Sequence, residues 1–135
     1  MLDSGPLIAA FDRSDDHHDA CAHLLRHTPG VLFVPPTVVA EVGYMIARQR
    51  FGSDLEASFL RTLADGTFTP LDLDTSDYTR MAELVEQYDD LPLGSTDASV
   101  VALAERLRVE RIATLDRRHF QVIRPRHCPA FDLVP

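Results

Sequence analysis

The sequence predicts a single α/β domain in which a mainly parallel β-sheet is flanked by α-helices. Short apolar runs of strand type alternate with longer segments of helical periodicity along the 135 residues. This alternation is typical of parallel sheets with crossover helices. The length suits one domain with its own hydrophobic core. No internal repeat, low-complexity tract or linker divides the chain, so we expect residues 1–135 to form one domain.

The first half of the chain opens with a strand of only three residues, which ends at Asp3. Ser4 and Gly5 then favour helix entry, and Pro6 fits a first helical turn, where its missing N–H is not needed. Gly30 ends a second helical stretch, and a compact apolar run of strand type follows it. The expected elements are a strand at 1–3, helices at 6–13 and 15–27, a strand at 31–34 and a helix at 37–49.

The second half of the chain alternates in the same way. Ser53 is suited to cap a helix, and Gly66 stands beyond its end. Pro70 weakens the next strand, which we therefore place at an edge of the sheet. The helix that Asp97 opens is apolar on almost all sides, so we expect it to be buried. The expected elements are helices at 53–66, 74–90 and 96–107 and strands at 68–73, 112–115 and 130–134.

Composition excludes several classes of protein. All thirteen basic residues are arginine, and the absence of lysine excludes Schiff-base chemistry and the P-loop. No apolar run approaches the 18 or so residues of a membrane span, and the start does not resemble a signal peptide. The two cysteines, Cys21 and Cys128, stand alone, which favours a reducing compartment. We therefore expect a cytoplasmic protein that does not associate with a membrane.

The charge is unevenly distributed. The net charge of −8 argues against binding of nucleic acid by bulk attraction. Residues 106–135, however, contain 7 arginines and 3 acids, whereas residues 1–105 contain 6 arginines and 18 acids. This asymmetry predicts a basic C-terminal surface on an acidic body, although a general abundance of arginine explains it equally well.

Four carboxylates occupy positions that favour a site. Asp3 and Asp116 each follow an expected strand, and ligand sites in open α/β sheets gather at the carboxyl ends of strands. Asp97 opens the buried helix. Glu41 lies three residues after Val38, a spacing that places it on the apolar stripe of its helix. An ionised carboxylate facing a core is costly unless it is paired, and no arginine stands three or four residues from Glu41.

Each acid also has an ordinary explanation as a turn former or as a favourable charge at a helix start. Four acids that converge without any lysine, however, require either shared protons or a cation. An all-oxygen set of ligands suits a hard divalent ion, of which Mg²⁺ and Mn²⁺ are the obvious candidates.

Four segments carry a resemblance to a known family. They resemble PIN-domain ribonucleases and, more narrowly, the toxin subunits of VapBC-type (VapC with VapB) toxin–antitoxin systems. The resemblance implies a PIN-like fold and a Mg²⁺-dependent endoribonuclease that hydrolyses RNA phosphodiester bonds, with Mn²⁺ as the alternative ion. The segments are LDSGPLIAAFD at 2–12, VVAEVGYM at 38–45, DLPLGSTDASVVALAERL at 90–107 and RIATLDRRHF at 111–120.

The resemblance also assigns roles to residues. The catalytic acids would be Asp3, Glu41, Asp97 and Asp116, with Asp3 and Asp97 as the principal metal ligands. Glu41 and Asp116 would complete the metal site or hold bound water. The residues expected to contact RNA are Ser4, Arg117, Arg118 and His119.

Two kinds of partner are implied besides RNA. One is a cognate VapB-type antitoxin whose C-terminal segment would occupy the acidic groove, which favours a basic peptide. The other is a second copy of the chain, because such toxins tend to be homodimers. The apolar YMIA stretch at 44–47 is a candidate for that interface.

Other functions receive less support. A non-catalytic PIN-like module that binds RNA or protein would keep the same acids without using them. An enzyme that forms an aspartyl phosphate would need a DxD opening or a lysine, but Asp3 is followed by Ser4 and Gly5, and the chain contains no lysine. His17 and Cys21 have the i, i+4 spacing of a zinc pair, but no second pair accompanies them, so a surface helix is the better interpretation.

Overall fold

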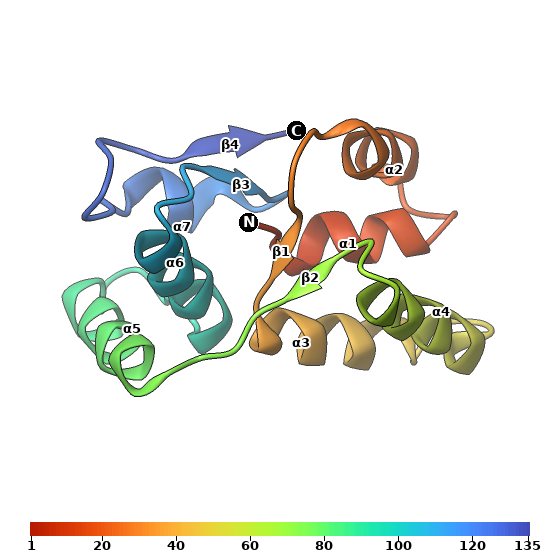
Figure 1. The fold of residues 1–135 in the computed structure, drawn as a ribbon, viewed down its shortest axis with the longest axis horizontal. Helices are drawn as coiled ribbons and strands as arrows, with labels where there is room; N and C mark the ends of the chain where they lie inside the picture. The colour runs from red at the N-terminus through yellow and green to blue at the C-terminus, as the bar shows by residue number, and fades with distance from the viewer.

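The computed structural model describes residues 1–135, in which four short strands and seven helices alternate along the chain. This confirms the predicted α/β class. In Figure 1, α5 and α6 lie to the left of the β1–β2 pair, and α1, α2 and α4 lie to its right. The helices are α1 (Ser4–Phe11), α2 (His18–His27), α3 (Pro36–Ile46), α4 (Gly52–Ala64), α5 (Thr75–Gln87), α6 (Ser95–Leu107) and α7 (Arg117–Val122); the strands are β1 (Phe33–Val34), β2 (Thr69–Pro70), β3 (Arg111–Ala113) and β4 (Asp132–Val134).

The strands form two parallel pairs, β1 with β2 and β3 with β4. The first residues of the chain lie between the pairs. The Leu2 N–H donates to Phe33 O, while Asp3 and Ala113 N–H groups donate to Ala113 O and Met1 O across the other side. The N-terminus accordingly sits between β1 and β3 in Figure 1. This central position brings the end of the first segment, Asp3, close to the end of β3.

The core lies between the strands and the helices. The innermost helix is α6, in which every residue from Ala98 to Ala104 is buried, as its apolar sequence predicts. It packs against α5 and also contacts α3. Fully buried Leu7, Val38 and Phe59 bring α1, α3 and α4 into the same apolar cluster. No helix in the structure combines the length and the apolar character that spanning a membrane requires.

Several elements differ from the sequence prediction. Helix α4 begins at Gly52 rather than after Ser53, and its N-cap residue Phe51 has a left-handed backbone with φ of 62°. A Cβ atom on Gly52 would lie 2.1 Å from Ala47 O, so only glycine fits this turn. The sequence prediction also lacked α7, whose six residues are too few to show helical periodicity. The predicted edge strand at 68–73 shrinks to β2, which does lie at an edge.

Both cysteines, Cys21 and Cys128, are free thiols, and Cys21 is fully buried in α2. His17 is exposed, whereas the Cys21 thiol is buried, so the two side chains are not placed to bind one zinc ion. No cluster with the composition and geometry of a zinc site is present elsewhere.

Candidate active site

Asp3 is the buried centre of the site. Its carboxylate caps α1: Oδ1 accepts a hydrogen bond from the Ser4 N–H at 2.7 Å. Its other oxygen, Oδ2, accepts from the Thr114 hydroxyl at 2.8 Å. Only 6% of Asp3 is exposed, and no basic side chain lies within ion-pair distance of it. The sequence analysis placed Asp3 at the end of a strand at 1–3, whereas the structure forms only an isolated parallel bridge between Leu2 and Ala113 there, and Asp3 directly follows this bridge.

This setting disfavours a negative charge on Asp3. Burial raises the pKa of its carboxyl from the ordinary 3.8 to about 6, even though the bonds from Thr114 and Ser4 lower it. The charges of Asp97 and Glu41 contribute to the raised pKa. Asp97 and Glu41 are therefore each close enough to repel a charge on Asp3, although the three acids come from segments far apart in the sequence.

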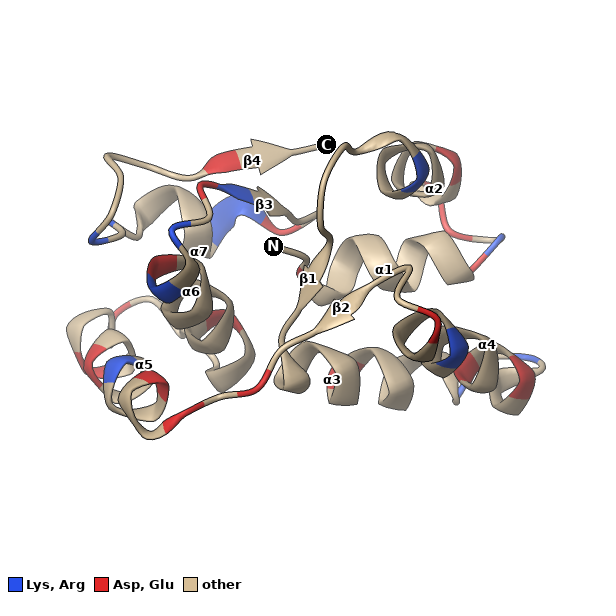
Figure 2. Ribbon diagram, in the orientation of Figure 1, with Lys and Arg blue, Asp and Glu red and all other residues tan.

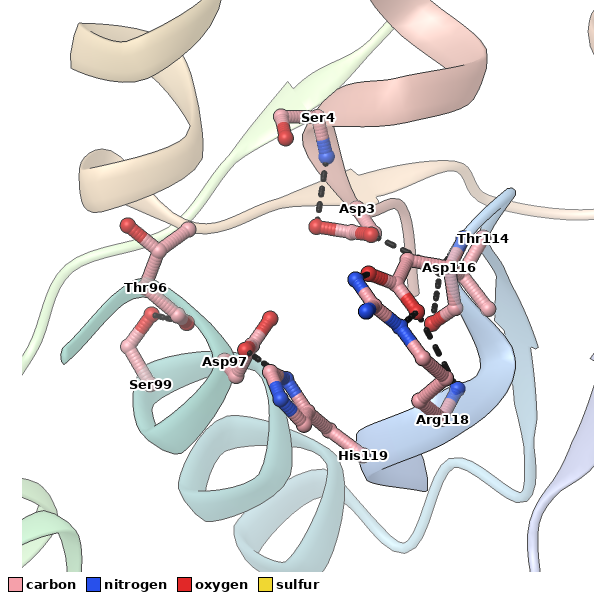
Figure 3. Close-up of polar contacts among 9 residues, drawn as sticks. All are labelled: Asp3, Ser4, Thr96, Asp97, Ser99, Thr114, Asp116, Arg118 and His119. Atoms are coloured by element: carbon pink, nitrogen blue, oxygen red, sulfur yellow. Dashed lines mark hydrogen bonds and ion pairs between the residues drawn. The ribbon is translucent and has the colours of Figure 1, made fainter. Parts of the chain in front are cut away.

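Thr114 is a site residue that the sequence analysis missed, because it looked like an ordinary strand residue. Its hydroxyl lies 1% exposed between two of the acids. Besides its bond to Asp3, it contacts the backbone of Asp116, accepting from the N–H and lying 3.1 Å from the carbonyl oxygen. One hydroxyl thus ties the end of the first segment to the end of the β3 segment (Figure 3).

Asp97 lies in the first turn of α6, where the helix dipole favours negative charge. Its Oδ2 lies 2.6 Å from Nδ1 of His119, and both side chains are largely buried, with 20% and 17% exposed. Its Oδ1 has no hydrogen-bond partner in the structure. Figure 3 shows the Asp97 and Asp3 side chains on opposite sides of one central space.

Asp116 follows β3 and is the N-cap residue of α7. Its Oδ1 accepts from the Arg118 N–H at 3.1 Å and from Arg118 Nε at 2.9 Å, and its Oδ2 lies 2.5 Å from Nη2. These bonds from Arg118 lower the pKa of the Asp116 carboxyl to about 2. The Asp116 carboxylate thus has a basic partner, which Asp3 lacks.

Glu41 corrects one sequence prediction, since it is exposed rather than buried on the apolar stripe of α3. The buried stripe runs through Val38, Val42 and Ile46, which are four residues apart. A residue three positions after Val38 falls about 60° to the other side of that stripe, at its wet edge. The Glu41 carboxylate makes no hydrogen bond or ion pair, yet its charge acts on Asp3.

An open hollow of about 610 Å³ leads to the site. Gly5 lets α1 pack closely against the segment after β3, because a Cβ there would lie only 3.2 Å from Leu115 Cβ. The Ser4 hydroxyl makes no hydrogen bond within the protein. The hollow is lined by Asp3, Ser4, Gly5, Leu115, Asp116, Arg117, Arg118 and Gln121.

The basic C-terminal segment is less available than its sequence predicts. Arg126 pairs with Glu83 at 2.6 Å, Arg106 with Asp77 at 3.0 Å and Arg111 with Asp132 at 2.7 Å. Blue and red positions accordingly lie side by side on α5 and α6 in Figure 2. Of the predicted RNA contacts, Arg118 is engaged with Asp116, His119 with Asp97, and Arg117 donates to the carbonyls of Leu133 and Pro135.

The four acids suit a metal ion in their chemistry but do not form a closed cage. No group of three or more His, Cys, Asp or Glu side chains lies in a geometry that would hold an ion directly. Repulsion among Asp3, Glu41 and Asp97 favours separation of their carboxylates. A buried carboxyl without a basic partner, surrounded by further oxygen donors, is nevertheless the donor set that a hard divalent cation prefers.

The protein is thus a parallel α/β domain with acids at the ends of its central segments. The family model described as the PIN domain matches residues 1–124. Ribonuclease VapC26 of Mycobacterium tuberculosis (strain ATCC 25618 / H37Rv) is 36% identical over 135 residues, which is 100% of this chain and 99% of that protein. The chain therefore belongs to the PIN-domain family and, within it, to the VapC type.

Solved structures confirm the fold. M. tuberculosis VapC20, described as a Sarcin-Ricin loop cleaving toxin, superposes with a TM-score of 0.80 at 14% identity, covering 87% of this chain and 90% of that one. VapBC2 from Rickettsia felis, bound to a DNA fragment from its promoter, gives a TM-score of 0.69 at 18% identity and covers 98% of this chain and 95% of that one. Identities this low establish the shared architecture alone.

Proposed function

We propose that this protein is a Mg²⁺-dependent endoribonuclease and the toxin of a VapBC-type toxin–antitoxin system. The observation that carries the proposal is the buried carboxyl of Asp3, which has no basic partner and is repelled by Asp97 and Glu41. A divalent cation would stabilise all three charges together. The full-length similarity to a ribonuclease of the VapC type supports RNA as the substrate.

In this proposal Asp3 and Asp97 are the principal ligands, and Glu41 and Asp116 complete the site or hold water. When bound there, Mg²⁺, or Mn²⁺ in its place, supplies a Lewis acid that activates water and offsets charge on the phosphate. Thr114 and the Ser4 N–H fix the orientation of Asp3 through their hydrogen bonds. Oδ1 of Asp97 and the carboxylate of Glu41 are free of partners and available to bind.

The remaining residues would position the RNA. The Ser4 hydroxyl, Arg117 and Arg118 line the hollow beside Asp3, where a phosphate would have to enter. Arg118 can exchange Asp116 for a phosphate oxygen, because its side chain is 81% exposed and solvent-exposed ion pairs contribute little stability. Hydrolysis then forms a bond from the water oxygen to phosphorus while the bond to the leaving ribose oxygen breaks and that oxygen takes up a proton.

RNA cleavage with matched variants tests the proposal. Purified protein and structured RNA in Mg²⁺ should yield discrete fragments, and excess EDTA should abolish them. Asp3→Asn and Asp97→Asn should reduce the rate by on the order of 100-fold or more, as the loss of a group that stabilises the transition state usually does. Asp132→Asn, which removes an exposed carboxylate of β4 paired with Arg111, should cleave as the wild type does.

The same experiment addresses the alternative of a non-catalytic PIN-like binding module. Such a module would bind RNA without cutting it in either ion, and the Asp3 and Asp97 variants would not differ from the wild type. Cleavage that continues unchanged in excess chelator would refute the metal mechanism. Growth arrest on induction of the wild type, but not of Asp3→Ala or Asp97→Ala, would establish toxicity that depends on the acids.

A VapB-type antitoxin is the proposed protein partner. The net charge of −8 favours a basic segment of the partner. A guanidinium is already accommodated at Asp116, which supports an arginine of a partner at the same place. Co-expression with a candidate VapB-type antitoxin should yield a complex that copurifies, and the lack of any complex would count against the toxin assignment.

A homodimer is the proposed assembly of the toxin itself. The YMIA stretch at 44–47 contributes less to a candidate interface than its sequence suggests, because Ile46 is fully buried in the core. Tyr44 and Met45 remain 62% and 45% exposed on the outer face of α3. Sedimentation of the wild type and of a Tyr44→Ser, Met45→Ser double variant tests whether this face pairs.

A further inference from the structure

We propose that His119 is a positioning residue, which holds the carboxylate of Asp97 in the orientation that a divalent ion requires. The inference rests on the proposed metal-dependent function and assigns His119 a role other than direct contact with RNA. It begins from the contact between His119 Nδ1 and Asp97 Oδ2, which are 2.6 Å apart. An ionised carboxylate has no proton to give, so Nδ1 is the donor.

The two side chains are anchored on rigid elements. Asp97 stands in the first turn of α6, the most buried helix of the fold. His119 stands on α7, which is fixed by the neighbouring core residues Phe120 and Ile123, 2% and 0% exposed. The bond therefore connects two packed helices, and it is largely shielded from water, since His119 is 17% exposed and Asp97 20%. Such a bond determines where Asp97 points.

The bond uses only one of the two Asp97 oxygens. Oδ1 has no partner, and the Asp97 charge acts on Asp3 across the site. Figure 3 shows Asp97 between the His119 ring and the space that Asp3 faces. Asp3 has its own orienting donors in Thr114 and the Ser4 N–H. His119 thus does for Asp97 what Thr114 does for Asp3, and each proposed principal ligand has an outer hydrogen bond that fixes it.

Such outer partners commonly change metal affinity by about 10–100-fold when they are replaced. Asparagine is the informative substitution, because its amide nitrogen lies where Nδ1 of histidine lies and can donate to the same oxygen. We therefore expect His119→Leu to weaken Mn²⁺ binding by about tenfold or more and His119→Asn to weaken it by less than about threefold. The matched controls are His27→Leu and His27→Asn, which change an exposed histidine of α2 and should leave the affinity unchanged.

The measurement is Mn²⁺ binding to RNA-free protein, followed by electron paramagnetic resonance of the free ion. The second readout is proton NMR of the protein in chelator, where the His119 Nδ1–H should give a downfield signal that Asp97→Ala removes. Equal affinity of wild type and His119→Leu, equal loss in the Leu and Asn variants, or absence of the NMR signal would overturn the inference alone. Failure of the wild type to bind any ion would overturn the proposed function and the inference together.

Discussion

Replacing Asp3 by asparagine should make the metal-free protein more stable at neutral pH, although it removes a residue from the centre of the proposed active site. The carboxyl has a pKa of about 6 in the folded protein and an ordinary value of 3.8. The difference is about two units, and each unit corresponds to about 1.4 kcal/mol. Ionised Asp3 therefore costs the folded state up to about 3 kcal/mol above pH 6.

The sign of the pH dependence follows from the same values. Between about pH 4 and pH 6 the folded protein keeps the Asp3 proton that the unfolded chain has released. The stability of the wild type, as far as Asp3 contributes to it, therefore falls as the pH rises through this window. Asparagine does not titrate, so Asp3→Asn escapes this loss. Its amide oxygen can accept from the Ser4 N–H, and the Thr114 hydroxyl keeps the Asp116 carbonyl as an acceptor.

The assay is chemical denaturation of both proteins in EDTA from pH 4 to pH 8. The free energy of unfolding of the two proteins should be similar at pH 4, and that of the variant should be larger by about 1–3 kcal/mol at pH 7.5. Mg²⁺ should narrow that gap, because ligand binding stabilises only the protein that binds it. The control is Asp77→Asn, which removes an equally buried carboxylate that pairs with Arg106 and should destabilise at neutral pH.

Two results would refute this reasoning. One is a difference between wild type and Asp3→Asn that stays constant from pH 4 to pH 8. The other is a variant that is less stable than the wild type at pH 7.5 in chelator. Either result would mean that the Asp3 charge has a stabilising partner in the folded protein, and the argument for a cation at this position would lose its basis.

Three further predictions concern contacts that hold the helices and segments of the fold together. Each is measured as a change in the free energy of unfolding by chemical denaturation. Thr114→Val should destabilise the protein by about 1–3 kcal/mol, because it deprives the Asp116 N–H of its acceptor and Asp3 of a donor. Thr79→Val, at an exposed position, is the control. An equal effect of both variants would contradict the role of Thr114 in joining Asp3 to the segment after β3. Gly52→Ala should destabilise the protein by about 2 kcal/mol or more, because the added Cβ clashes with Ala47 O. Gly94→Ala places its Cβ in open space and should change the free energy of unfolding little. Similar costs for the two variants would mean that the α3–α4 turn rearranges freely. Arg80→Met should destabilise the protein by about 3 kcal/mol, because it leaves the largely buried carboxylate of Glu105, 8% exposed, without its arginine. The control Arg126→Met breaks only an exposed ion pair and should cost under about 1 kcal/mol. A larger cost for Arg126→Met than for Arg80→Met would be inconsistent with the burial of the two pairs.

The fold was predictable because its determinants are local. Strand-type runs, helix starts and the apolar character of the segment around Ala98–Ala104 can each be recognised within a few residues. The positions of Asp3, Asp97 and Asp116 at the ends of segments follow from the same local signals. Helix α7 escaped prediction because it has six residues and begins with two arginines, so neither length nor periodicity indicates it.

Burial of Glu41 was predicted wrongly for a reason that applies to any short helix. Residues three and four positions after a given residue both lie near its face of the helix, but on opposite sides of it. In α3 the core follows the spacing of four through Val38, Val42 and Ile46, which turns Glu41 outward. Its exposure strengthens its proposed role, because an acid at the wet edge of the site can approach Asp3 without being buried first.

The pairing of the arginines depends on contacts that no local pattern records. Arg126 and Arg106 find their acids on α5, Glu83 and Asp77, at sequence separations of 43 and 29 residues. The packing of α5 against α6 brings Arg106 to Asp77, and a hydrogen bond from the Arg126 N–H to Glu105 Oε1 holds Arg126 beside α6. A run of positive charge in a sequence is therefore weak evidence for a nucleic-acid surface until its intramolecular acids are known. In this protein we therefore expect the RNA contacts at the hollow beside Asp3 rather than at the C-terminal arginines in general. There, a phosphate can replace Asp116 as the partner of Arg118, and a cation can replace Arg118 as the partner of Asp116.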